Sequence, residues 1–141
     1  MLIVLLVHIL SCLFLTGLIW TVQSVHYPSF HFVNNDSFEE FSSFHQTSIT
    51  KIVAPVMIIE FITAIILIYL NCEPFFLLNL ITVLFLWCST MFISVPIHKS
   101  LSHKKDYRLI DRLVQTNWLR TTTWTIRSLM LITFLSSLVQ L

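Results

Sequence analysis

Three of the six histidines lie where they could act together, at the ends of predicted helices. His26 follows the first apolar stretch, His45 precedes the second, and His98 follows the third. At the helical rise of ~1.5 Å per residue, all three fall in the same third of a helical bundle. Imidazole binds Cu, Fe and Zn, and it also transfers protons. We therefore expect a transition metal (Cu, Fe or Zn) or haem bound by His26, His45 and His98. The alternatives are direct acid–base use without metal, and histidines that bond only to backbone or lipid head groups.

Polar residues on the last predicted helix point toward the same region. Asn117, Arg120, Trp124 and Arg127 recur at spacings of three and four, which places them on one helix face. Polar side chains at this depth face the interior of a bundle, where they orient ligands or contact substrate. We expect Asn117 and Arg120 to lie beside His98 and to share in its chemistry.

Glu60 and Arg127 are the two charges deepest in the apolar stretches. Each lies about nineteen residues, or ~28 Å, from the expected start of its helix. A lone charge at the centre of a bilayer costs ~2.5–3.5 kcal/mol, and such charges almost always pair. The matching depth predicts a buried Glu60–Arg127 ion pair. The alternatives are a protonated Glu60, and an Arg127 that snorkels or binds a substrate anion.

The composition is that of a membrane protein. The chain has 141 residues, of which 56% are hydrophobic and 11% charged, against about 25% charged in soluble domains. Apolar stretches predict one domain with four membrane spans, at about 2–26, 38–70, 75–98 and 108–140. The first lacks the positive n-region of a signal peptide. The fold expected is an all-α integral membrane four-helix bundle, antiparallel and up-down-up-down.

The charges predict an orientation for this bundle. All Lys and Arg residues except Arg120 and Arg127 lie at the end that carries the first and third connections: Lys51, Lys99, Lys104, Lys105, Arg108 and Arg112. Because positive residues stay cytoplasmic, we expect both termini outside and the long connections in the cytoplasm, in a bacterial inner membrane. A net charge of +1 excludes a generally basic nucleic-acid binder, so the expected partner is the lipid bilayer. The single glycine, Gly17, excludes every Gly-rich phosphate loop.

Three segments of the C-terminal half resemble a known family: 95–101 (VPIHKSL), 117–121 (NWLRT) and 124–127 (WTIR). They are similar to the second hairpin of the anthrone-oxygenase-like family of small four-helix membrane proteins. That family has a Val-Pro-polar element after its third helix and an Asn-Trp-plus-Arg element in its fourth. The resemblance implies a bundle that oxidises or binds a hydrophobic aromatic compound near the cytoplasmic face. Asn117 and Arg120 would then contact substrate, and His98 would be an acid–base group or a ligand. The chain departs from the family at His98, where asparagine is usual.

Two functions from different classes remain open on the sequence. The first is a membrane-embedded, oxygenase-like redox enzyme, metal- or haem-dependent, with a polar pocket of His98, Asn117 and Arg120 acting on a hydrophobic small molecule. The second is a non-catalytic accessory or structural subunit of a membrane complex, or a homo-oligomer. A transporter ranks third, because four spans are few for one chain.

Overall fold

The computed structural model of the chain describes residues 1–139, and every regular element in that range is a helix. This confirms the prediction of an all-α fold. The elements, in chain order, are α1 (Leu2–Thr21), η1 (Val22–His26), α2 (Tyr27–Ser29), η2 (Phe30–Phe32), α3 (Asn35–Leu70), α4 (Pro74–Ser89), η3 (Thr90–Ser94), α5 (Val95–Leu101) and α6 (Tyr107–Val139).

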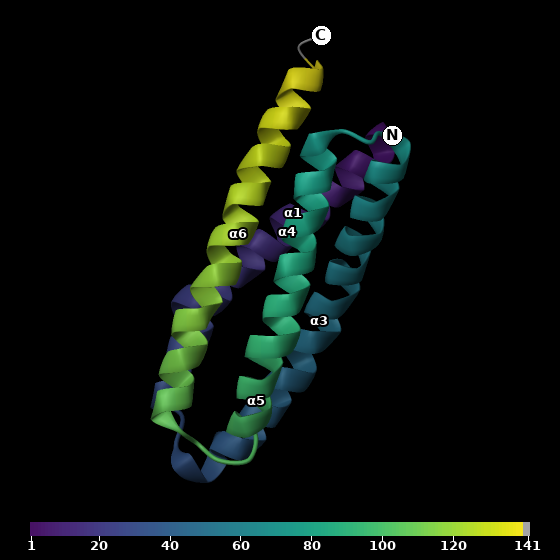
Figure 1. The fold of residues 1–141 in the computed structure, drawn as a ribbon. Coiled ribbons are helices and arrows are strands. Elements are labelled where there is room, and N and C mark those ends of the chain that lie inside the picture. The colour runs from purple at the N-terminus through teal and green to yellow at the C-terminus, as the bar shows by residue number, and fades with distance from the viewer. Residues whose placement is uncertain (140–141) are drawn as a thin grey trace.

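These elements form four long rods that lie side by side (Figure 1). α1 packs against α3 and α6, and α4 packs against the same two helices, so α3 and α6 lie diagonally across the bundle. The start of α1 and the last described turns of α6 lie at one end of the bundle in Figure 1. The connections after η2 and after α5 lie at the other end, which we call the loop end.

Three of the rods are long and apolar enough to cross a membrane: Leu2–Phe32, Asn35–Leu70 and Pro74–Leu101. By length and composition the chain is therefore a membrane protein. α6 is also long enough, with 33 residues, but it is less apolar. Many of its polar side chains are buried inside the bundle, whereas Trp118, Leu119, Ile126 and Leu129 are exposed. Residue 140, the last of the predicted fourth span, lies outside the described residues.

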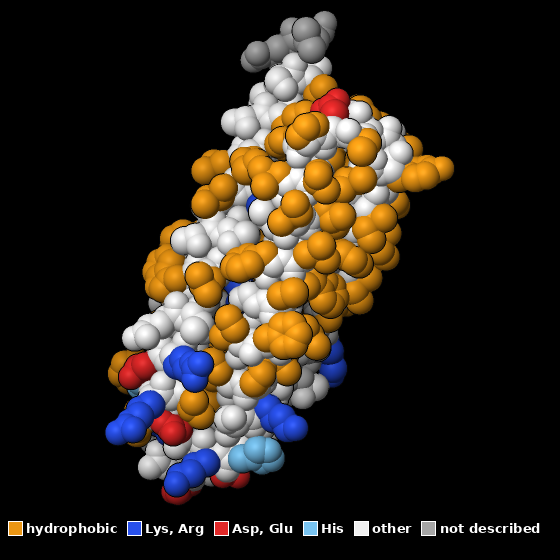
Figure 2. Space-filling view, in the orientation of Figure 1, with side chains coloured by type: hydrophobic (Ala, Val, Ile, Leu, Met, Phe, Trp, Pro, Cys, Tyr) orange, Lys and Arg blue, Asp and Glu red, His pale blue; other side chains and the backbone are white. Residues whose placement is uncertain are grey.

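Charge and apolar surface separate along the bundle. Figure 2 shows Lys and Arg side chains gathered at the loop end, while hydrophobic side chains cover most of the remaining face. The exposed hydrophobic residues include large side chains from all four rods, such as Ile3, Ile62, Phe92 and Ile126. A surface of this kind is compatible with contact to lipid tails.

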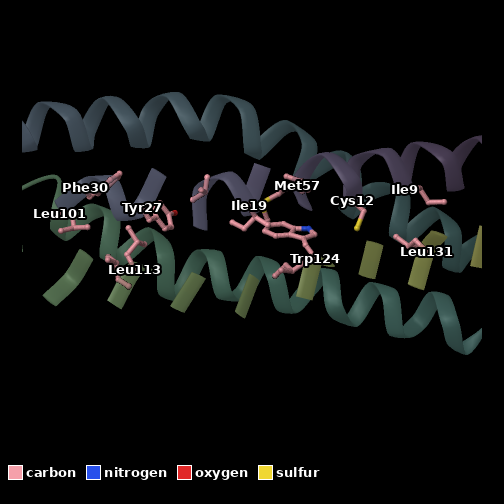
Figure 3. Packing of buried hydrophobic residues seen from close by; sticks show 14 of the residues in the cluster. Ile9, Cys12, Ile19, Tyr27, Phe30, Met57, Leu101, Leu113, Trp124 and Leu131 are labelled. Atoms are coloured by element: carbon pink, nitrogen blue, oxygen red, sulfur yellow. The ribbon is translucent and has the colours of Figure 1, made fainter. Parts of the chain in front are cut away.

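Buried apolar side chains run along the whole axis of the bundle (Figure 3). Phe30 and Leu101 lie near the loop end, the Trp124 indole lies beside Ile19 near the middle, and Leu131 lies toward the other end. Lipid tails are as apolar as this core, so helix association in a bilayer depends on close packing and polar contacts. The polar side chains inside the bundle therefore bear on both folding and function.

Two π-helical segments interrupt the rods near the loop end, η1 and η3. Each closes with a bond across five residues, from the N–H of Tyr27 to Val22 O and from the N–H of Val95 to Thr90 O. A proline follows directly in both cases, at Pro28 and Pro96. A π-turn adds one residue to a helical turn, which rotates everything after it around the helix axis. The residues rotated in this way include Tyr27 and His98.

Candidate functional site

The bundle interior holds two groups of polar side chains. The histidine cluster lies near the loop end and consists of Gln23, His26, Tyr27, His45, His98, Asn117 and Arg120. The ion-pair cluster lies further along the axis and consists of His8, Glu60, Thr63, Asn79, Trp124 and Arg127. Polar groups buried among apolar ones need hydrogen-bond or charge partners. The two clusters differ in the partners that their arginines have.

The three histidines that the sequence singles out lie together. His26 Nε2 is 2.6 Å from His45 Nδ1, and the rings of His45 and His98 have centroids 5.4 Å apart. His98 Nε2 is bonded instead to the hydroxyl of Tyr27, at 2.9 Å. The two rotated segments thus bring His26 and Tyr27 from one rod against His98 from another.

This arrangement gives the predicted metal or haem site no support. Among residues 1–139, no group of three or more His, Cys, Asp or Glu side chains is placed to hold a metal ion. The reason is visible in the partners: His26 and His45 turn ring nitrogens toward each other, and His98 turns Nε2 toward Tyr27. The four aromatic side chains form two separate hydrogen-bonded pairs, His26–His45 and Tyr27–His98.

A hydrogen bond to Asn117 holds Arg120 in place. Its Nη2 donates to Asn117 Oδ1, and also to the Tyr27 hydroxyl at 3.4 Å. Asn117 in turn donates from Nδ2 to Gln23 Oε1 at 2.7 Å, and Gln23 donates to the backbone oxygen of Val114. Asn117 is completely buried, and its side-chain amide bonds to Arg120 and to Gln23.

The charge of Arg120 has no counter-ion in the described part of the chain. The side chain is 6% exposed, and neither ion pair within residues 1–139 includes it. Its Nε is buried without a hydrogen-bond partner. Because a guanidinium stays protonated in proteins, the histidine cluster carries a buried positive charge that no carboxylate balances.

A cavity of about 210 Å³ opens beside this charge. Its polar lining includes Tyr27, His98 and Arg120, all from the half nearer the loop end. The remaining lining is mostly apolar and comes from α1, η1, α3, α4, η3, α5 and α6: Leu15, Leu18, Ile19, Val22, Gln46, Ile49, Thr50, Val53, Ala54, Met57, Trp87, Thr90, Met91, Ser94, Val95 and Trp124.

We infer that the mouth of the cavity lies between α3 and η3, from the exposure of the lining residues there. α3 packs against α4 and against α5, whereas η3 between them contributes Thr90, Met91 and Ser94 to the cavity lining. Three lining residues at this seam are exposed on the outside of the bundle: Thr50, Met91 and Val95. The cavity therefore communicates with the apolar surface of the bundle.

In the ion-pair cluster, the positive charge of Arg127 is paired with the negative charge of Glu60. Arg127 Nη1 lies 2.5 Å from Glu60 Oε1, with both side chains almost fully buried. Arg127 Nη2 donates to Asn79 Oδ1 at 3.0 Å, and the Trp124 indole N–H donates to the same Glu60 carboxylate. His8 completes the group, with Nδ1 2.8 Å from Thr63 Oγ1. Such a paired, hydrogen-bonded set offers no free charge to a ligand.

Two features of these clusters were not predicted from the sequence. Tyr27 was not singled out, although an aromatic hydroxyl directly after His26 is a natural partner for a buried ring. His8 was not singled out either, and it is buried and bonded to Thr63 and Asn79. The sequence feature that could have identified both residues is a polar side chain within or beside an apolar stretch.

The chain matches no protein-family model, no curated protein and no solved structure in the three comparisons with known proteins. Its function is therefore inferred from the cavity and from the polar side chains that meet it.

Proposed function

We propose that the chain is a membrane-embedded, oxygenase-like enzyme that acts on a hydrophobic small molecule held in the cavity. The observation that carries this proposal is an apolar cavity with Tyr27, His98 and Arg120 converging on its polar end. Mostly apolar pockets with a few convergent polar groups are the usual form of small-molecule sites.

The membrane is the source of the substrate in this proposal. The mouth between α3 and η3 is bordered by exposed Thr50, Met91 and Val95, on the part of the bundle that apolar side chains cover. A hydrophobic molecule dissolved in the bilayer would enter there without crossing water. Lipid contact by the apolar helices supports this route.

His98 is the acid–base group of the proposed reaction. It lines the cavity, and its Nε2 shares a hydrogen bond with the Tyr27 hydroxyl. An imidazole placed in this way can take a proton from a bound molecule. Arg120, held by Asn117, would then stabilise the negative charge that proton removal leaves on the substrate.

The oxidative part of the proposal comes from the resemblance of segments 95–101, 117–121 and 124–127 to the anthrone-oxygenase-like family. Proton removal from a C–H bond leaves an electron-rich carbanion. Dioxygen, the co-substrate of an oxygenase, would form a C–O bond with it, take up the proton to give a hydroperoxide, and leave a carbonyl group when that hydroperoxide loses water. The structure supports the hydrophobic-substrate and acid–base parts through the cavity and His98.

We further propose that the loop end faces the cytoplasm and that both termini face outward, in a bacterial inner membrane. Lys and Arg gather at the loop end of the bundle (Figure 2), and positive residues remain on the cytoplasmic side of a membrane. This orientation places the histidine cluster near the cytoplasmic face.

The test is oxygen uptake by the purified chain in lipid nanodiscs, measured with aromatic ketones and phenols of one to three rings. We expect His98→Ala to lower the rate by roughly 10²–10⁴-fold, the usual contribution of general acid–base catalysis. His103→Ala is the matched control, because that histidine is exposed in a connection and lies outside the cavity lining. Equal rates for the wild type and His98→Ala would refute the assignment of His98.

The same preparation tests the second candidate function. A chain that takes up no oxygen with any of these compounds, and that copurifies with a stoichiometric partner, would be an accessory or structural subunit. A chain that runs as a homo-oligomer with intact activity would leave the enzymatic proposal in place.

A further inference from the structure

Two buried arginines lie on the same face of α6, and they differ in one respect. Arg127 pairs with Glu60 at 2.5 Å, whereas Arg120 has no carboxylate partner within residues 1–139. Both are more than nine-tenths buried. A buried, permanently charged guanidinium without a counter-ion is costly, so an arrangement that keeps one calls for an anion from elsewhere.

The cavity shows where that anion would lie. Arg120 lines it, and Tyr27 and His98 line it beside Arg120. Arg120 uses Nη2 for its contacts with Asn117 and Tyr27. Its Nε, like the Nε of Arg127, has no partner within residues 1–139, so the two arginines differ in the carboxylate that only Arg127 contacts. A guanidinium carries five N–H donors in a planar fork, which suits the two oxygens of a carboxylate.

We propose that the cavity takes a small amphiphilic anion, with an ionised oxygen acid on Arg120 and an apolar body among the aliphatic and indole side chains. This inference rests on the proposed function and names its substrate class. The head group is a carboxylate, or a phenolate formed when His98 takes the proton. The body is apolar because most of the cavity lining is apolar.

The cavity also limits the size of this molecule. An apolar cavity of about 150 Å³ is large enough to hold benzene. The cavity here is about 210 Å³, so it fits one aromatic ring together with a carboxylate, or a short aliphatic acid. A larger body would extend through the mouth between α3 and η3 into the surrounding lipid.

The neighbouring side chains favour an anion over a cation. The side chains of Asn117 and Gln23 are uncharged amides, and they bond to each other, to Arg120 and to the backbone oxygen of Val114. The Tyr27 hydroxyl is a neutral donor and acceptor beside Arg120. The charge that a ligand meets at this end of the cavity is therefore positive.

The experiment compares two probes that share one body and differ in the head group, para-trifluoromethylbenzoate and para-trifluoromethylbenzyl alcohol. Binding to the full chain in a neutral detergent is measured by fluorine NMR. A charge-assisted hydrogen bond contributes about 1.5–3 kcal/mol, so we expect the wild type to prefer the acid by roughly tenfold to a hundredfold. Competition by octanoate distinguishes a lipid-derived acid from an aromatic one.

Variants of α6 assign the preference to one side chain. Arg120→Gln should abolish the preference for the acid and leave the affinity for the alcohol nearly unchanged. Arg112→Gln is the matched control, an exposed arginine on the same helix, and should bind both probes like the wild type. Arg120→Lys keeps the positive charge and should keep a preference for the acid. This variant tests the role of the charge at position 120 if Arg120→Gln does not fold.

The outcomes separate this inference from the function on which it rests. Equal binding of acid and alcohol by the wild type would overturn the anionic substrate class and leave the cavity as a binding site. Failure of the folded wild type to bind either probe or octanoate would overturn both. Preference for the acid that survives Arg120→Gln would place the anion at another residue and refute the proposal.

Discussion

The Glu60–Arg127 pair allows a quantitative test of how this bundle tolerates buried charge. Glu60→Gln leaves the Arg127 guanidinium with Asn79 and His8 as its remaining partners, and Arg127→Gln leaves a carboxylate with only the Trp124 N–H. Removing one member of a buried ion pair costs about 3–5 kcal/mol, because the other charge stays buried and unpaired. The double variant lacks both charges, so no unpaired charge remains buried in it.

We therefore expect the double variant to be more stable than the sum of the two single losses implies. A coupling free energy of about 2–3 kcal/mol is appropriate for two residues in direct contact at 2.5 Å. The measurement is reversible unfolding of the detergent-solubilised chain in rising fractions of a denaturing detergent, followed by tryptophan fluorescence.

The chain supplies its own control for this cycle. His31 and Asp111 also form an ion pair, at 3.0 Å, but their side chains are 31% and 61% exposed. Exposed pairs contribute about 0.2–1 kcal/mol, so His31→Asn with Asp111→Asn should show little coupling. Coupling at Glu60–Arg127 no larger than at this exposed pair would refute the reasoning.

Three shorter predictions follow from the site, its mouth and its orientation. Asn117→Ala should destabilise the fold by about 1–3 kcal/mol, since buried donors of Arg120 lose their acceptor, and it should weaken acid binding in the fluorine NMR titration. Met91→Trp should slow probe binding without lowering thermal stability, because the larger ring would narrow the exposed mouth. With both termini outside, an impermeant maleimide should label exposed Cys72 in intact cells but not the Cys72→Ser, Ser102→Cys variant, which has its cysteine in the opposite turn; the reverse pattern would invert the proposed orientation.

Part of this structure follows from simple depth arithmetic. Helices in an apolar setting are rigid rods with a fixed rise, so residues equally far from one end arrive at equal depth. That reasoning places Glu60 opposite Arg127, and it gathers His26, His45 and His98 at one end. It needs no knowledge of loops or side-chain conformation.

Other features escape such arithmetic because they depend on single turns. The π-turns at η1 and η3 add a residue each, and no period of hydrophobic residues reveals them. They decide that Tyr27, not a neighbouring residue, meets His98. Similarly, sequence alone cannot distinguish histidines that share a metal from histidines that bond each other, because ring orientation decides between them.

The polar network around His8 was missed for another reason. Its partners Thr63 and Asn79 lie 55 and 71 residues away in the sequence, on two other rods. A single polar residue in an apolar stretch carries no periodic signal. Only the packing of α1 against α3 identifies its partner.

The two arginines of α6 suggest a final test, in which Arg120 at the cavity is given a carboxylate partner like the one that Arg127 has in the ion-pair cluster. Arg120 precedes Arg127 by seven residues, nearly two helical turns, and Val53 precedes Glu60 on α3 by the same interval. Val53 lines the cavity, so a small apolar side chain stands where a carboxylate would neutralise Arg120. Val53→Glu should create a second ion pair at that level, abolish the preference for para-trifluoromethylbenzoate and leave a folded chain. Val53→Gln is the control of similar size, and it should retain the preference for the acid. If Val53→Glu binds the acid as the wild type does, the charge of Arg120 is not what the ligand meets.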